Sequence, residues 1–177
     1  MRIRNYRQID LPALVHIQQR AAQLDGLKAM DEMEMEEWLT QPELEAVHNV
    51  FVITDDDETN TWGQAGTLEG LEGEIVGYTV LQFRKNEHGY HFLCLGAVDP
   101  DYRHRNAGRA LLICALNRAR MLSEEFEIEA EQADIPIYFE ALLPLGNPIS
   151  PLLAKKCEME PVEEPALEGT KLYRRRL

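Results

Sequence analysis

The stretch VDPDYRHRNAGRALL, residues 98–112, decides the fold of this 177-residue chain. An apolar strand ends at Val98, Pro100 fixes an extended exit, and a polar turn leads directly into an amphipathic helix. The first N–H groups of a helix have no partner inside it, and the helix dipole is positive there. Ala107 and Gly108 are small enough to let an anion approach this backbone closely. The stretch therefore predicts a strand–turn–helix junction that binds a phosphate or pyrophosphate.

The distribution of charge also favours an anion at this junction. The chain has a net charge of −13, yet residues 102–122 contain no acidic residue. The arginines of this window are Arg103, Arg105, Arg109, Arg118 and Arg120. The acidic balance of the whole chain argues against nucleic acid, which is bound through clustered Lys and Arg.

Neither a membrane nor a metal is expected as a partner. No apolar run approaches the roughly 20 residues that span a bilayer, and the first residues lack the apolar core of a signal peptide. We therefore expect a cytoplasmic protein. Cys94, Cys114 and Cys157 are odd in number and far apart, which indicates buried thiols and neither a disulfide framework nor a metal site.

The remaining patterns predict a single α/β domain over residues 1–177. The expected strands are residues 2–6, 47–54, 74–83, 90–98, 135–143 and 170–175. The expected helices are residues 11–24, 31–39, 107–122 and 149–157. Residues 55–73 are expected to form a long hairpin connection. This order predicts a largely antiparallel sheet with one right-handed crossover, from the strand at 90–98 through the helix at 107–122 to the strand at 135–143.

The opening stretch resembles the motif V-x-P-x-[FY]-[RQ]-x-x-G-x-[GA]-x-x-L, which wraps the pyrophosphate of acetyl-CoA in GNAT N-acetyltransferases. The matching residues are Val98, Pro100, Tyr102, Arg103, Gly108 and Leu111. Asn106 replaces the first glycine, and asparagine tolerates the left-handed conformation better than other non-glycine residues. The resemblance extends along most of the chain. It implies the GNAT fold, a mixed and mostly antiparallel sheet of six to seven strands with splayed central strands and about four flanking helices.

The same resemblance implies an acetyl-CoA-dependent N-acetyltransferase. Its acceptor would be an amine of a small molecule or peptide, attacked directly in a ternary complex, and a homodimer stays open. The residues that would contact acetyl-CoA are Gly96, Ala97, Val98, Arg103, His104, Arg105, Asn106, Ala107, Gly108, Arg109 and Asn147. A helix cap before Pro148 explains Asn147 equally well.

The resemblance also shows which proton-transfer groups are missing. The tyrosine that many GNAT enzymes use as general acid corresponds to Ala154, and a frequent base position corresponds to Phe92. His91 and Tyr138 are the substitute catalytic candidates, because an imidazole titrates near pH ~6.5 and a phenol can donate a proton. A surface histidine and a buried aromatic are the plain alternatives. The sequence thus leaves two hypotheses, an enzyme or a non-catalytic acyl-CoA-binding module with a degenerate active site.

Overall fold

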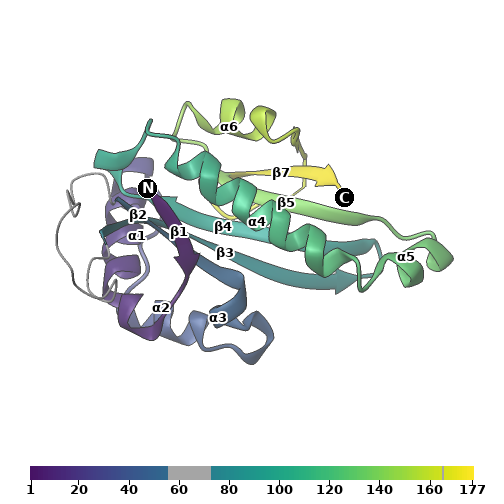
Figure 1. The fold of residues 1–177 in the computed structure, drawn as a ribbon. Helices are drawn as coiled ribbons and strands as arrows, with labels where there is room; N and C mark the ends of the chain where they lie inside the picture. The colour runs from purple at the N-terminus through teal and green to yellow at the C-terminus, as the bar shows by residue number, and fades with distance from the viewer. Residues whose placement is uncertain (56–72, 165) are drawn as a thin grey trace.

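The computed structural model describes residues 1–55, 73–164 and 166–177. Within them the chain forms a seven-stranded sheet in the order β1-β2-β3-β4-β5-β7-β6 (Figure 1). The strands are β1 (Arg2–Asn5), β2 (Val50–Asp55), β3 (Glu74–Asn86), β4 (Gly89–Val98), β5 (Ile137–Pro144), β6 (Glu160–Pro161) and β7 (Thr170–Arg176). The helices are α1 (Leu11–Asp25), α2 (Glu32–Leu39), α3 (Ala46–Asn49), α4 (Ala107–Ser123), α5 (Glu127–Ala133) and α6 (Ser150–Lys156).

The topology is the predicted one. All neighbouring strands of the sheet pair antiparallel except β4 and β5, which are parallel and are connected through α4. This confirms the mixed, mostly antiparallel sheet and the crossover inferred from the order of the elements. No helix in the described ranges is both long and apolar enough to cross a membrane.

Helices cover both faces of the sheet, and each face has its own core. One core joins α4 and α6 to β4 and β5, with Phe92 and Phe139 at its centre. The other joins α1 and α2 to β2 and β3, with Met35 among its fully buried side chains. The consecutive residues Val80 and Leu81 belong to different cores, as expected for the two faces of one strand.

Local signals explain where the helices begin and end. α1 ends at Gly26, whose φ of 70° is the left-handed conformation that glycine adopts without a steric penalty. α2 begins with a capping box, in which Asp31 accepts from the Glu34 backbone and Glu34 accepts from the Asp31 backbone. The segment that connects α1 to α2 therefore runs from Gly26 to Asp31.

The short elements differ from the sequence prediction. The strand expected at residues 47–54 begins at Val50, because the preceding four residues form α3 and leave Val47 exposed. α5 and β6 have seven and two residues, too few for a hydrophobic period to reveal them. The connection predicted at residues 55–73 lies almost wholly outside the described residues.

Candidate functional site

The central strands β4 and β5 separate at their carboxyl ends. Their parallel pairing stops where Cys94 lies opposite Ala141. Beyond this pair, and among the described residues, β4 continues along β3 alone and β5 continues along β7 alone. We call the space between residues 95–98 of β4 and residues 142–144 of β5 the wedge. The splayed central strands expected from the sequence are therefore present.

The strand register determines which backbone groups of β4 face the wedge. The N–H of Tyr90 donates to a carbonyl next to β5, whereas the N–H of Asp99 donates to Val76 of β3. The register with β3 is continuous, so successive residues turn their N–H and C=O groups to opposite sides. The backbone groups of Gly96 and Val98 consequently face the wedge.

The predicted contact residues in β4 differ in what they offer. Gly96 has no room for a side chain, because a Cβ would collide with the carbonyl oxygen of Tyr78. The backbone of Ala97 faces β3, and its side chain packs on the α1 and α2 core. The carbonyl of Val98 accepts a hydrogen bond of 3.4 Å from Nε of Arg103. β4 thus presents two backbone donors to the wedge, the N–H groups of Gly96 and Val98.

The β4–α4 turn, residues 99–106, has a constrained backbone. Asp99 caps the short 3-10 helix Pro100–Tyr102 by accepting a backbone hydrogen bond of 2.9 Å. His104 and Asn106 both have a φ of 66°, the left-handed region that non-glycine residues rarely occupy. Asn106 stands at the N-cap of α4, where the motif has glycine. The replacement therefore preserves the left-handed turn that the glycine would have made.

The first turn of α4 leaves room for a ligand. Ala107 is buried, whereas Gly108 is half-buried. A Cβ built on Gly108 would meet Val98 Cγ2 at 3.7 Å and Leu153 Cδ2 at 3.9 Å, which are ordinary contacts. The folded chain itself does not require glycine at this position. Glycine here leaves the backbone of the first turn of α4 uncovered by a side chain.

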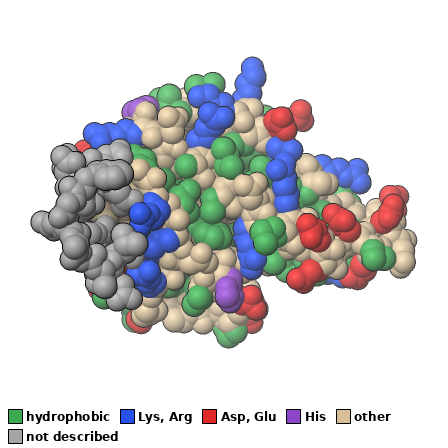
Figure 2. All heavy atoms as spheres, in the orientation of Figure 1, with side chains coloured by type: hydrophobic (Ala, Val, Ile, Leu, Met, Phe, Trp, Pro, Cys, Tyr) green, Lys and Arg blue, Asp and Glu red, His purple; other side chains and the backbone are tan. Residues whose placement is uncertain are grey.

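The three arginines of the junction are not equivalent. Arg103 donates from both Nη atoms to the buried carboxylate of Asp25, at 2.8 and 2.7 Å, and is neutralised by it. Arg105 is 59% exposed and lies 3.8 Å from Asp55, and Arg109 is exposed on α4. Basic side chains lie around the start of α4, whereas acidic ones gather over α5 (Figure 2). Arg105 and Arg109 are the cations available to an anion.

A pocket of about 310 Å³ lies beside this turn. It brings Arg103 and His104 together with Asn147, three residues that the sequence analysis assigned to the same site. The side-chain oxygen of Asn147 accepts the N–H of Ile149 at 3.0 Å in the turn before α6, whose N-cap is Ile149 and not Asn147. The lining residues are Leu24, Asp25, Pro100, Arg103, His104, Gly146, Asn147, Pro148 and Ile149.

The two catalytic candidates lie side by side. His91 and Tyr138 are opposite each other in the β4–β5 pairing, with ring centroids 5.6 Å apart. Nδ1 of His91 is 3.1 Å from Oε1 of Glu140, and Nε2 is 3.3 Å from Oδ1 of Asn86. That amide oxygen also accepts the backbone N–H of His88. Both ring nitrogens thus lie within hydrogen-bond distance of side-chain oxygens.

Glu140 connects this pair to a larger ionic network that the sequence analysis missed. Nε of Arg174 donates to Oε1 of Glu140 at 2.6 Å, and both Nη atoms of Arg174 donate to Glu164 at 2.7 Å. The guanidinium of Arg174 also lies 4.7 Å from the ring centroid of Tyr138. Glu140 is 6% exposed, and its signal in the sequence is an acidic residue inside the apolar strand IPIYFEALL.

The network lies on the face of the sheet opposite α4. Phe92 and Phe139 point into the α4 core, so their neighbours His91 and Glu140 point to the other face. Phe92 and Ala154, the two positions where the motif family carries its base and acid, are fully buried in the α4 core. Glu140 precedes the last paired residue of β5, which places it next to the apex of the wedge.

The thiols are unsuited to covalent chemistry. Burial raises the pKa of Cys94, at the apex of the wedge, to about 12, and Thr79 Oγ1 lies 3.1 Å from its sulfur. Burial also raises the pKa values of Cys114 and Cys157. The thiolate is the nucleophilic form, so these side chains are inert near neutral pH. The expectation of buried thiols holds for Cys94 and Cys157, whereas Cys114 is half-buried.

Comparison of the sequence with protein families gives one assignment. The family described as "Acetyltransferase (GNAT) family" matches residues 25–138. The match contains the β4–α4 turn, the first turn of α4 and the greater part of the sheet. No curated protein matches the sequence.

Solved structures share the fold at low sequence identity. A ribosomal-protein-alanine N-acetyltransferase from Brucella melitensis has a TM-score of 0.64 at 19% identity, with 100% of both chains covered. A phosphinothricin acetyltransferase from Sinorhizobium meliloti, in complex with acetyl-CoA, has a TM-score of 0.65 at 18% identity, covering 99% of this chain and 88% of that one. A putative acetyltransferase from Salmonella typhimurium with acetyl-CoA has a TM-score of 0.61 at 15% identity, covering 99% and 92%.

Proposed function

Because the chain belongs to the GNAT acetyltransferase family, we propose that it transfers an acetyl group from acetyl-CoA to an amine of a small molecule or peptide. The observation that carries this proposal is the wedge, which lies next to a constrained turn and an open helix N-terminus. A ligand that joins an anionic end to a linear arm would fill both places, with the anionic end at the turn and helix N-terminus and the arm in the wedge.

The residues present fit this cofactor. The half-buried backbone at Gly108, which carries no side chain, suits a phosphate against the helix, and Arg105 and Arg109 would balance its charge. The N–H of Val98 and the carbonyl of Gly96, which face the wedge, would pair with the amides of the pantetheine arm. The residues proposed around the cofactor are Gly96, Ala97, Val98, Arg103, His104, Arg105, Asn106, Ala107, Gly108, Arg109 and Asn147.

Acetyl-CoA supplies an acetyl group that is activated as a thioester. The Gly96 N–H, which lies nearer the wedge apex, can donate to the carbonyl oxygen and stabilise the negative charge that develops on it. The inert thiol of Cys94 at the wedge apex favours direct attack by the amine in a ternary complex over a covalent cysteine intermediate.

We assign proton transfer to the network on the opposite face, with Glu140 as the proton acceptor. Both of its hydrogen bonds go to Oε1, and none is present at Oε2 within the described residues. His91 and Arg174 hold the carboxylate in place, and Tyr138 is the candidate donor to the leaving thiolate because of its position beside them. The pyrophosphate would lie on the α4 face, and a cofactor that passes through the wedge would bring its acetyl end to the opposite face, where Glu140 stands next to the apex.

A second candidate function is acyl-CoA binding without transfer. The observation in its favour is that Phe92 and Ala154 are fully buried apolar side chains, which leaves no acid or base on the α4 face at those positions. The two functions share the cofactor and differ only in turnover.

Titration with CoA, followed by thiol release from acetyl-CoA over a panel of amines, tests the proposal. The panel includes a peptide with N-terminal alanine and phosphinothricin, after the names of two structures with the same fold. We expect CoA binding and turnover with at least one amine. Binding without turnover on any amine would favour the binding module, and absence of CoA binding would contradict both functions.

The role of Glu140 is tested with Glu140→Gln. Loss of a positioned acid or base slows transfer by about 10²- to 10⁴-fold, and affinity for CoA should stay unchanged. Glu164→Gln is the matched control, because Glu164 contacts the same arginine but is 53% exposed. An unchanged rate in Glu140→Gln would remove Glu140 from the mechanism.

A further inference from the structure

Three ion pairs join α1 to the β4–α4 turn, and the two with buried carboxylates run in opposite directions. Asp25 of α1 accepts both Nη atoms of Arg103 from the turn. Arg20 of α1 donates from Nη1 to both oxygens of Asp99 in the turn, at 2.9 and 2.7 Å, and from Nη2 to Asp101 at 2.8 Å. We call Asp25–Arg103 and Arg20–Asp99 the α1–turn ion pairs. The carboxylates of Asp25 and Asp99 are 5% and 7% exposed, so both are held in a largely desolvated interface.

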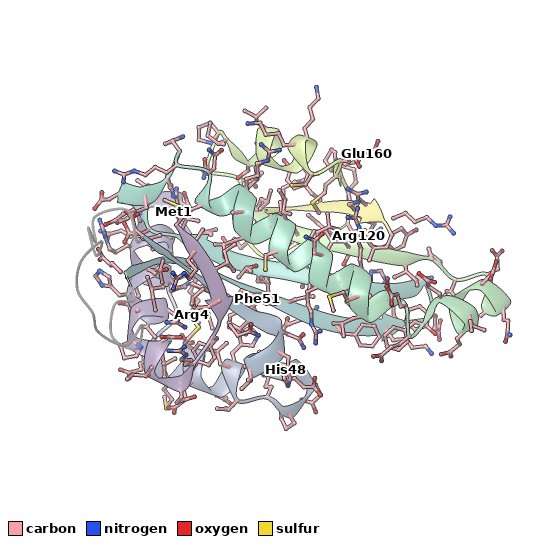
Figure 3. The ribbon with its side chains drawn as sticks, viewed as in Figure 1. Met1, Arg4, His48, Phe51, Arg120 and Glu160 are labelled. Atoms are coloured by element: carbon pink, nitrogen blue, oxygen red, sulfur yellow. The ribbon has the colours of Figure 1, made fainter. Side chains whose placement is uncertain are left out.

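The position of Asp25 is unfavourable for the helix taken alone. It is the last residue of α1, where the negative end of the helix dipole disfavours a carboxylate by about 0.3–1 kcal/mol. The bidentate contact with Arg103 explains why an acidic residue stands there. The opposite end of α1 is fixed in a similar way, because Arg4 of β1, labelled in Figure 3, donates to Asp10 just before the helix.

The turn between these ion pairs and α4 contains the left-handed residues His104 and Asn106. Each such residue costs of order 1–2 kcal/mol unless it is glycine, and it persists only where its surroundings hold it. Arg103 directly precedes His104, and Asp99 begins the turn. The α1–turn ion pairs therefore hold the segment whose backbone leads into the first N–H groups of α4.

We propose that Asp25 and Arg20 are positioning residues for the cofactor, which hold the β4–α4 turn in its binding conformation before the cofactor arrives. This inference rests on the proposed function. In this proposal Arg103 does not contact the phosphate. It holds the turn through its ion pair with Asp25, and Arg105 and Arg109 contact the phosphate. It also places the end of α1, through Leu24 and Asp25, in the wall of the pocket beside the turn.

The consequence is a link between the two sides of the wedge. α1 packs on the face of the sheet that carries Glu140, whereas α4 packs on the other face. A cofactor that tightens the turn also fixes the end of α1 through Asp25. By thermodynamic reciprocity, a ligand that orders α1 strengthens cofactor binding by the same factor.

The test measures the dissociation constant of CoA by calorimetry, well below the unfolding midpoint, for Asp25→Asn and for the charge exchange Asp25→Arg with Arg103→Asp. We expect Asp25→Asn to raise this constant by about tenfold or more, which corresponds to about 1.4 kcal/mol. The exchange restores the pair and should return the constant to within about twofold of wild type. Lys28→Ala is the matched control, since its ion pair with Glu34 is exposed and should leave CoA binding unchanged.

The competing explanations give different results. If Arg103 contacts phosphate directly, the exchanged variant binds as poorly as Arg103→Asp alone, and the proposal is overturned. If Asp25 serves only folding, Asp25→Asn lowers the unfolding midpoint while CoA binding and the KM for acetyl-CoA stay unchanged, which also overturns it. If the exchanged variant does not fold, the unfolding midpoint and the CoA dissociation constant of Asp25→Asn alone decide between these explanations. A wild-type chain that binds no CoA contradicts the proposed function itself and is thereby distinguished from failure of this inference.

Discussion

Replacing Gly108 by alanine separates the stability of the fold from its capacity to bind a cofactor. The new methyl group would meet Val98 Cγ2 at 3.7 Å and Leu153 Cδ2 at 3.9 Å, so no atom of the folded chain has to move. Alanine in the body of a helix is more stable than glycine by about 0.5–1 kcal/mol. For a chain of this length, about 1 kcal/mol raises the unfolding midpoint by roughly 2–4 °C.

The same methyl group occupies the space that a phosphate needs against the backbone of α4. We therefore expect Gly108→Ala to raise the unfolding midpoint of the free protein while it weakens CoA binding by about tenfold or more, or about 1.4 kcal/mol. Thermal unfolding without ligand and calorimetric titration with CoA measure the two effects. Wild-type affinity for CoA in this variant would show that the anion site is not at Gly108.

Ala110→Gly provides the matched control for helix propensity. The N–H of Ala110 already donates to the carbonyl of Asn106 at 2.9 Å, so it is not open to a ligand. This variant should lower the unfolding midpoint and keep wild-type affinity for CoA. If Ala110→Gly also loses CoA binding, affinity for CoA follows the stability of α4. The weaker binding of Gly108→Ala would then not be evidence for a phosphate at Gly108.

Three further predictions follow from other parts of the structure. Asn106→Ala should lower the free energy of unfolding by about 1 kcal/mol, whereas Asn106→Gly should not, because only glycine and asparagine accept the left-handed conformation readily; urea unfolding measures both. Cys94→Ala should retain transfer, and iodoacetamide should leave Cys94 unmodified near neutral pH by mass spectrometry, since burial holds its pKa at about 12. Burial alone would raise the pKa of Asp10, but hydrogen bonds from Arg4 and the Arg7 backbone outweigh it, and the pKa falls below the ordinary 3.8. The stabilisation that ionised Asp10 gives to the fold is then complete above pH 3.8 and is lost as the pH falls through the lower pKa of the folded state. Arg4→Ala should therefore make the free energy of unfolding depend less on pH in this range.

The sequence predicted the parts of the site that local physics determines. The helix start, the small residues Ala107 and Gly108 and the left-handed Asn106 all lie within one short stretch, and each depends on its immediate neighbours. The parallel pairing of β4 and β5 followed from the strand–helix–strand order, because a crossover through a helix joins parallel strands.

The partner of Arg103 could not be predicted in this way. Asp25 lies 78 positions away in the sequence, and nothing local distinguishes an arginine that binds phosphate from one that binds a carboxylate. The acidic residue at the end of α1 was a signal, since the helix dipole disfavours it there. That signal indicates an unknown cationic partner and cannot identify it without the packing of α1 on the turn.

The network around Glu140 bears on the choice between an enzyme and a binding module. A buried ion pair or triad contributes little stability on balance, and apolar residues of similar size often stabilise a fold as well or better. In the α4 core, Phe92 and Ala154 are such apolar residues, and binding a cofactor requires nothing more of them. On the opposite face, Glu140 and Arg174 are held largely away from water next to the wedge apex, where stability alone gives no reason for ionic groups. A group that must accept a proton from an amine would give that reason, and this is what the proposed transfer adds to cofactor binding.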